Sequence, residues 1–531
     1  MAFMHHHRQE NPGLFRRFAL AGLCLTVGFV APASRSQGIV PAAMPDPGVS
    51  GYRFPESEAT LTGWITEADR GDAGAPAARA KIFLHGWGLW TALTAETPQF
   101  FAGQRLRVFE TWLTPEDLTS QPNLRTVGAR SRQQRRRAPL RTLDQLGARA
   151  RAAGPSTRTA DDGAAGRVVG FVKFDPAAAD HILQQRLLET GALDSLLQGG
   201  AQGVPPFPAS ALAVKSIFQV IPAADLVDGR YYALKAWSGP PAVVQAWGPA
   251  QWPGCVWIDL FDGGSGQGAI DEAPQSDGST RAAETTYPLL NFIHYRLSAD
   301  DAAAVNADKP ATGASAGDYA ILVGMHVAGR EIARWTWQTF WWTPAPDDPP
   351  APSSAAIASQ RPLQLRGPAR HYAMALAYTM LSPDQPYIGG DNAGAAVYAY
   401  NPWVEARFAP ADLPDSQPGL DPAGRPAGNN YGVETNCMSC HARATYNPNA
   451  RNTAPRFAGA RYVDLIDPQF VGTLQVDFLW SLPRRAVSRA TEPAASFPLG
   501  PGADVSLTPP MPMPLPIPDF NHPRNPNSFE P

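Results

Sequence analysis

The sequence predicts a mainly β protein of the α+β class. We expect a large antiparallel β-rich body, sandwich-like or barrel-like, followed by a loop-rich C-terminal part with a few helices. Short runs of β-branched and aromatic residues alternate with Gly/Pro-rich loops through much of the chain. The 55 Pro and 47 Gly residues make up nearly a fifth of the 531 residues and disfavour a helical bundle. The 14 Trp residues favour aromatic packing in a β-rich core.

The predicted strands lie between Gly51 and Trp342. A pair of longer runs, 318–327 and 331–342, is joined at Ala328-Gly329-Arg330 and predicts a hairpin. Short strands between Gly/Pro loops favour an antiparallel body over a βαβ fold. We therefore interpret residues 34–342 as one β-rich domain. The shorter strand-like runs are 81–87, 104–113, 231–237, 256–261 and 291–297.

One helix interrupts this domain. Asp175 suits its N-cap and Pro176 suits its first helical position. Its apolar stripe consists of Leu183, Leu187, Leu188, Leu196 and Leu197.

Charge is distributed unevenly along the chain. Residues 125–167 contain eleven Arg against Asp144, Asp161 and Asp162, which gives this segment a charge of +8. The whole chain has a net charge of −3, so the remaining residues together carry about −11. The segment 121–167 lacks apolar periodicity, and we interpret it as a solvated, disordered insertion. The alternative is a surface on which an anionic partner protein or the membrane docks. Nucleic acid is not an expected partner.

The C-terminal third begins after a Pro/Ala/Ser-rich linker, 343–362. A helix is predicted over 371–381. A second helix is predicted from Asp467-Pro468 to Leu482, ending at Pro483. Residues 494–531 are Pro-rich and are interpreted as an extended tail, which leaves 363–493 as the second structured region.

The N-terminus predicts an export signal over residues 1–33. Arg16-Arg17 precede an apolar run, 18–30, and Ala31-Pro32-Ala33 offers a small-residue cleavage site. The run is too short to span a bilayer, and no later run of 18 apolar residues occurs. We expect a periplasmic protein without a transmembrane segment in the mature chain. An N-terminal anchor is the alternative.

Cys437-Met438-Ser439-Cys440-His441 forms a C-x-x-C-H string. This spacing places both sulfurs and the imidazole on one side of a helical turn. In these five residues the chain resembles the c-type cytochromes. The resemblance implies one covalently bound haem c, with thioethers from Cys437 and Cys440 and with His441 as the proximal iron ligand. It also implies that 363–493 is the haem-binding region.

The cysteines allow two other interpretations. A structural zinc site needs four ligands, and Cys255 is far away in the sequence. A thioredoxin-like dithiol needs a βαβ setting, which the Pro/Gly/Asn-rich segment 418–430 does not favour. We interpret Cys255 as a buried free thiol.

The second axial ligand cannot be assigned from the sequence. In small electron-transfer cytochromes c, a methionine downstream of the motif binds the iron, but here none occurs between the motif and Met511 and Met513 in the tail. His371 and Met374, on one face of the predicted 371–381 helix, are the first candidates. An open sixth position is also considered. Further candidates are Met380, His85, His294 and His326, the three histidines lying in predicted strands.

Aromatic side chains near the motif have two interpretations. Those of 335–342 are expected to pack in the core, and the alternative is that some of them line an approach to the haem. Tyr431 and Tyr462 are expected to be structural, with contact to a haem propionate as the alternative.

The leading hypothesis is an exported monohaem c-type cytochrome that exchanges single electrons with redox partner proteins. One alternative is a haem enzyme of peroxidase or oxygenase type with an open distal iron site, because roughly 500 residues exceed what a small carrier needs. Another is a β-rich module that binds a surface or polymer, with a redox haem. The sequence does not determine whether the protein is an enzyme.

Overall fold

The computed structural model describes most of the chain from residue 39 to residue 488. The predicted signal peptide, nearly all of the Arg-rich insertion and the Pro-rich tail with Met511 and Met513 lie outside the described residues. The described residues belong to one compact unit that ends at Ser488. They are 39–101, 103–120, 141–142, 167–308, 310–410, 413, 431–449 and 459–488.

A seven-stranded sheet forms the centre of the described part, with the strand order β12-β11-β10-β5-β4-β3 and with β9 paired to β10. Every pairing within it is antiparallel. The predicted α+β, mainly β class is confirmed, and the sheet is open rather than closed into a barrel in the part described. The strands are β3 (Arg141–Thr142), β4 (Val168–Phe174), β5 (Leu212–Ile221), β9 (His294–Arg296), β10 (Tyr319–Gly329), β11 (Thr336–Trp342) and β12 (Tyr372–Ala377).

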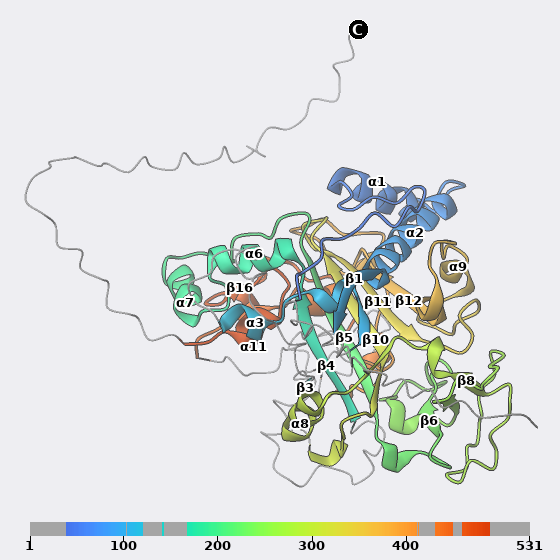
Figure 1. Cartoon of the computed structure of the whole chain (residues 1–531). Helices are drawn as coiled ribbons and strands as arrows, with labels where there is room; N and C mark the ends of the chain where they lie inside the picture. The colour runs from blue at the N-terminus through green and yellow to red at the C-terminus, as the bar shows by residue number, and fades with distance from the viewer. Residues whose placement is uncertain are drawn as a thin grey trace, which may run out of the picture. The chain divides into compact units, whose positions relative to one another are not determined.

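Helices pack around this sheet (Figure 1), with α1 and α2 at one end of the view and α6 and α7 at the other side. The helices are α1 (Glu58–Asp69), α2 (Ala75–Thr94), α3 (Pro115–Thr119), α6 (Pro176–Gln185), α7 (Thr190–Gln198), α8 (Ala299–Asp308), α9 (Ala355–Ala358), α10 (Cys437–His441) and α11 (Ser481–Arg485). Smaller sheets are formed by β6 (Tyr231–Lys235), β7 (Cys255–Asp259) and β8 (Thr286–Pro288), by β1 (Glu96–Phe101) and β2 (Gln104–Arg107), by β13 (Leu381–Ser382) and β14 (Ala395–Ala396), and by β15 (Thr445–Tyr446) and β16 (Leu474–Gln475).

Strand β11 separates two parts of the core. Successive side chains of a strand point to opposite faces of the sheet. On one face, Phe340 stacks on Trp90 of α2, with ring centroids 4.3 Å apart. On the other face, Trp337 lies 4.1 Å from the ring of His441, between ring centroids. The motif therefore packs on the sheet face opposite α2.

Several predicted elements are confirmed. The 318–342 hairpin is present as β10 and β11, although the turn extends from Arg330 to Trp335. The helix at Asp175 is present, and its carboxylate accepts hydrogen bonds from the backbone N–H groups of Ala177 and Ala178. The helix is divided by Arg186, whose φ of 56° ends α6 before α7 begins.

Three predicted elements are wrong. Residues 81–87 belong to helix α2, whose second half is buried all round, so no polar face marks its helical period. Residues 372–377 form strand β12 rather than a helix, because β11 offers a complete edge for pairing. Residues 467–482 form a 3₁₀ turn, strand β16 and the start of α11, because positive φ angles at Gly472, Asp477 and Phe478 interrupt a helix.

Two further sequence interpretations differ in detail. The run 104–113 continues after β2 as a 3₁₀ helix, Val108–Thr111. The Pro-rich segment 343–362 contains helix α9, which is capped by Ser354. The domain boundaries at this segment stay a prediction, although β12, which follows it, pairs with β11, which precedes it.

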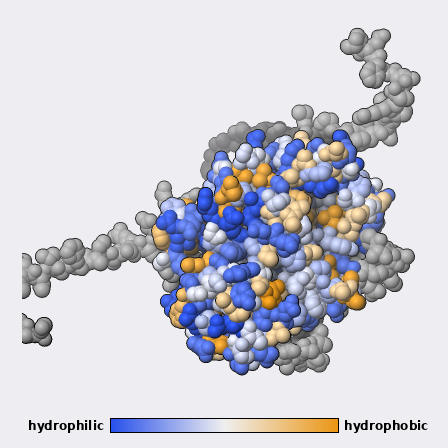
Figure 2. Space-filling view, turned by 90° about the vertical axis from the view of Figure 1, so that its right-hand side faces the viewer, coloured by the Kyte–Doolittle hydropathy of each residue, from blue (hydrophilic) through white to orange (hydrophobic). Residues whose placement is uncertain are grey.

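The surface in Figure 2 carries apolar side chains in small groups rather than in one continuous patch. Within the described ranges, no helix combines the length and the apolar character needed to cross a membrane.

Candidate functional site

Helix α10 is a single turn fixed by polar contacts at its N-cap, Asn436, and at Ser439. The Asn436 side chain accepts a hydrogen bond from the Ser439 N–H (3.0 Å) and donates to the carbonyl oxygens of Thr379 (3.1 Å) and Val397 (2.8 Å). Ser439 Oγ donates to the carbonyl oxygen of Arg461 at 2.6 Å. An N-cap that is itself bound to two neighbouring segments sets the start and the direction of the turn.

The turn divides the motif into a buried and a presented side. Met438 and Ser439 are fully buried. Cys437, Cys440 and His441 are only partly buried, and the two cysteines form no disulfide. The three residues that a c-type haem requires therefore share the presented side of α10, as the spacing predicts.

The surroundings of the two thiols raise their pKa values. Burial, together with the Glu405 carboxylate, raises the pKa of Cys440 to about 12 and that of Cys437 well above its ordinary range. Nucleophilic and metal-binding cysteines have lowered pKa values instead. In the described part of the chain, no group of three or more His, Cys, Asp or Glu side chains is arranged to hold a metal ion. The thioredoxin-like and zinc readings gain no support.

His441 is held in one orientation. Its Nδ1 lies 2.8 Å from the carbonyl oxygen of Phe478. A carbonyl can only accept, so Nδ1 carries the proton and Nε2 keeps its lone pair, which is the form that binds iron. Burial lowers the pKa of His441 to about 3 and keeps the ring neutral. The left-handed backbone of Asp477 and Phe478 positions this carbonyl.

A pocket with a cavity volume of about 110 Å³ lies beside His441 and opens to solvent. The cavity is smaller than a typical cofactor site, so a porphyrin would also occupy the solvent-open side. Its floor is the sheet face opposite α2, where Ala213 of β5 and Ala328 of β10 are direct neighbours. Their small side chains leave the hollow that bulkier residues would fill. Trp337 of β11 is the cross-strand neighbour of Ala328 and borders the pocket on the side of His441.

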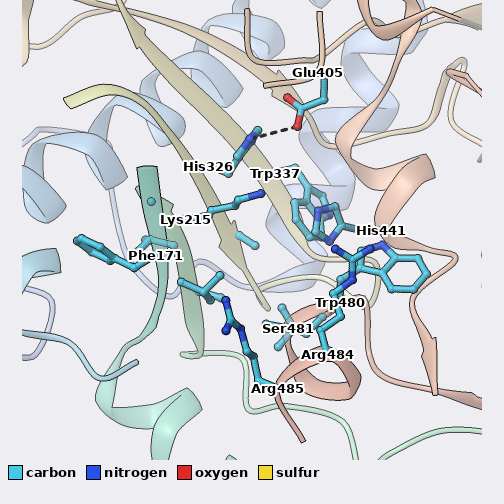
Figure 3. A pocket seen from close by; sticks show the side chains of 16 residues that line it. Phe171, Lys215, His326, Trp337, Glu405, His441, Trp480, Ser481, Arg484 and Arg485 are labelled. Carbon is cyan, nitrogen blue, oxygen red and sulfur yellow. Dashed lines mark ion pairs between the residues drawn. The ribbon is translucent and has the colours of Figure 1, made fainter. Parts of the chain in front are cut away.

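The polar side of the pocket contains Lys215, His326 and Glu405 (Figure 3). Lys215 and His326 are cross-strand partners on β5 and β10. His326 Nε2 lies 3.3 Å from Glu405 Oε1. Burial alone would raise the pKa of Glu405, but His326, Lys215 and a backbone hydrogen bond from Asn401 outweigh it and lower that pKa. Glu405 is therefore ionised, beside His326, and its charge raises the pKa of both thiols.

Of the three motif residues, His441 lines this pocket, and the residues around it are compatible with a haem on the presented side of α10. The two cysteines and His441 supply the attachment and the proximal ligand. Apolar groups including Phe171, Leu479 and Trp480 line the pocket and suit a porphyrin ring. Arg484 and Arg485 of α11 line it as well, and cations of this kind suit propionate groups.

The first candidates for the distal ligand do not line this pocket. Met374 is buried in β12 opposite Phe340, and His371 ends the 3₁₀ helix before that strand. Burial lowers the pKa of His371 to about 4. Met380 accepts a hydrogen bond from the backbone N–H of Val463. The assignment of His371 or Met374 as distal ligand gains no support from these positions.

Of the three strand histidines considered, the structure brings His326 to the pocket. His294 lies in β9, where its Nδ1 is 2.9 Å from the Phe292 carbonyl oxygen. His85 lies in α2 rather than in a strand, and its Nδ1 is 2.6 Å from the hydroxyl of Tyr378. Sequence reasoning missed Lys215 and Glu405. Lys215 becomes visible only from the strand register, and nothing local in the sequence marks Glu405.

The remaining sequence interpretations have mixed outcomes. Cys255 is buried without a disulfide, as predicted, and burial raises its pKa to about 12. The aromatic residues of 335–342 pack in the core as predicted, and Trp337 also contacts His441. Tyr462 accepts a hydrogen bond from the Gly390 N–H, which suits its structural interpretation.

Comparison of the chain with known proteins found no matching family model, no similar curated protein and no similar solved structure. The functional argument therefore depends on the residues of the site.

Proposed function

We propose that the protein is an exported, monohaem c-type cytochrome that transfers single electrons through a covalently bound haem. One observation carries the proposal: Cys437, Cys440 and His441 share one side of α10, and His441 lines a pocket with its Nε2 lone pair kept free by the Phe478 carbonyl. Attachment adds each thiol S–H across a vinyl C=C of the porphyrin, so two C–S bonds form and no oxidant is needed.

The haem supplies a one-electron iron couple when bound. The chain contributes the environment that sets the potential of that couple. The Phe478 carbonyl orients His441 and increases its donor strength, as partners of this kind do in other metal sites. Trp337 packs against the same imidazole and fills the space beside it. The apolar walls of the pocket favour the less charged, reduced state of the iron.

Export and redox partners belong to the same proposal. Haem c is attached outside the cytoplasm, so the function requires the N-terminal signal interpreted from the sequence. The periplasm is the expected location, and the partners are other redox proteins.

The second candidate function is a haem enzyme with an accessible distal iron site. The observation in its favour is the pairing of His326 with the ionised Glu405 in the pocket. Such a pair is able to move a proton to or from a small ligand. The optical spectrum of the reduced protein separates the two functions, because carbon monoxide binds to an accessible iron and does not bind promptly to a six-coordinate one.

The test of the proposed function is covalent haem. The full chain is expressed in a host with cytochrome maturation machinery, denatured and extracted with acidified acetone. We expect the pigment to stay with the polypeptide. The double variant Cys437→Ala/Cys440→Ala should release or lack it. Cys255→Ala is the matched control, since it removes a buried thiol outside the motif, and it should retain the pigment. A wild-type protein without pigment would refute the proposal.

A further inference from the structure

We propose that His326 is the second axial ligand of the haem iron, which makes the centre a six-coordinate bis-histidine site. This inference rests on the proposed function and extends it. It assigns the position opposite His441, which the sequence leaves open, and it selects the electron carrier over the enzyme with an open iron.

His326 and His441 line the same pocket. They come from different walls, with His441 on α10 and His326 on the sheet floor (Figure 3). Two imidazoles that border one pocket from two walls are able to bind the two faces of a flat cofactor between them.

The Nε2 atom of His326 is unsatisfied. It is buried and lacks a hydrogen-bond partner among the described residues. Glu405 Oε1 is 3.3 Å away but does not have the angle of a hydrogen bond. Buried polar atoms without partners are rare and call for a function or an absent ligand. A metal bond at Nε2 would satisfy this atom.

His326 is also held rigidly. It lies within β10, which is paired with β5 at Lys215 and with β11 at Thr339. A residue between two neighbouring strands cannot move far from its position. Iron ligands on regular elements are held more accurately than ligands on loops.

Lys215 also lies beside His326 but is the weaker candidate. An ammonium must lose its proton before it binds a metal, and an unperturbed lysine keeps that proton up to about pH 10. A neutral imidazole needs no such change.

The experiment compares wild type, His326→Ala and His294→Ala as holoproteins. His294→Ala is the matched control, because His294 is also a strand histidine but does not line the pocket. We expect the wild type to be low-spin, with a reduced spectrum that carbon monoxide does not change. His326→Ala should become high-spin and bind carbon monoxide, and added imidazole should restore the low-spin spectrum. His294→Ala should match the wild type.

Two outcomes would overturn the inference. One is a wild-type spectrum that shifts promptly with carbon monoxide, which would favour the enzyme with His326 and Glu405 as a proton-transfer pair. The other is a His326→Ala spectrum that stays low-spin, which would assign another ligand. His326→Gln gives the same readout if the Ala variant is not recovered. Absence of covalent haem from the wild type would instead refute the proposed function itself, so the two failures are distinguishable.

Discussion

Replacing Gly432 with Ala tests how tightly the segment that carries Glu405 is fixed. Gly432 lies against the backbone of this segment, and its N–H donates to the Phe408 carbonyl oxygen at 2.9 Å. A Cβ at this position would overlap the Glu405 carbonyl group and come within 3.0 Å of the Ala406 carbonyl carbon. These are backbone atoms, which cannot rotate away as a flexible side chain can. The chain around Glu405 would have to move.

The expected cost is at the upper end of the range for overpacking, about 3 kcal/mol or more. For a domain of this size, the melting temperature should fall by several degrees. Differential scanning fluorimetry of the holoprotein measures the change. The shift of Glu405 should also move His326, so the visible spectrum of Gly432→Ala should differ from that of the wild type.

The matched control is Gly63→Ala in helix α1. A Cβ there meets no atom within 4 Å, and Ala favours a helix more than Gly does, by about 1 kcal/mol. Gly63→Ala should therefore melt at or slightly above the wild-type temperature. If Gly432→Ala melts at the same temperature as the wild type, the segments that contain Gly432 and Glu405 are not as close as described. The position given for Glu405 would then be wrong as well.

Two further changes test the packing away from the pocket. Burial raises the pKa of Asp175 from 3.8 to about 7, so the folded protein binds this proton more tightly than the unfolded chain. The contribution of Asp175 to stability should be fully present below about pH 4, decrease by up to ~4 kcal/mol as the pH rises to about 7, and stay level above. Asp175→Asn keeps an acceptor for the helix cap and should remove this contribution in melting curves recorded across pH; an unaltered pH profile would contradict the assignment. Tyr378→Phe removes the oxygen that is 2.6 Å from His85 Nδ1 and 2.8 Å from Gln338 Nε2. It should cost about 2 kcal/mol in denaturant unfolding without altering the visible spectrum, and a neutral effect would show that this buried network is dispensable.

Local patterns predicted the elements that depend on local chemistry. Asp175 and Pro176 mark a helix start in sequence and cap α6 in the structure. The long apolar runs of β10 and β11 meet across a short connection, so their pairing needs no distant partner. The C-x-x-C-H spacing places its three functional residues on one side of α10 because a single turn is enough to do so.

Other elements depend on partners that no local pattern contains. The segment Tyr372–Ala377 is rich in Ala, Met and Leu, which favour helices, but pairing with β11 makes it a strand. The turns of helix α2 that contain Trp87 and Trp90 are buried on every side, so the sequence shows no polar face that would mark the helical period. In the pocket, the neighbours Lys215 and His326 are brought together only by the β5–β10 register. Glu405 follows no strand or helix signal, and its position depends on the contact with Gly432.

The central claim is that Cys437 and Cys440 carry a haem through sulfur, and peptide mapping by mass spectrometry tests it most directly. The protein is purified from a host that matures cytochromes c, denatured and digested. We predict that the peptide containing α10 carries the added mass of one intact haem, and that the peptide containing Cys255 is unmodified. An α10 peptide recovered at its plain mass, with two alkylatable thiols, would contradict the account.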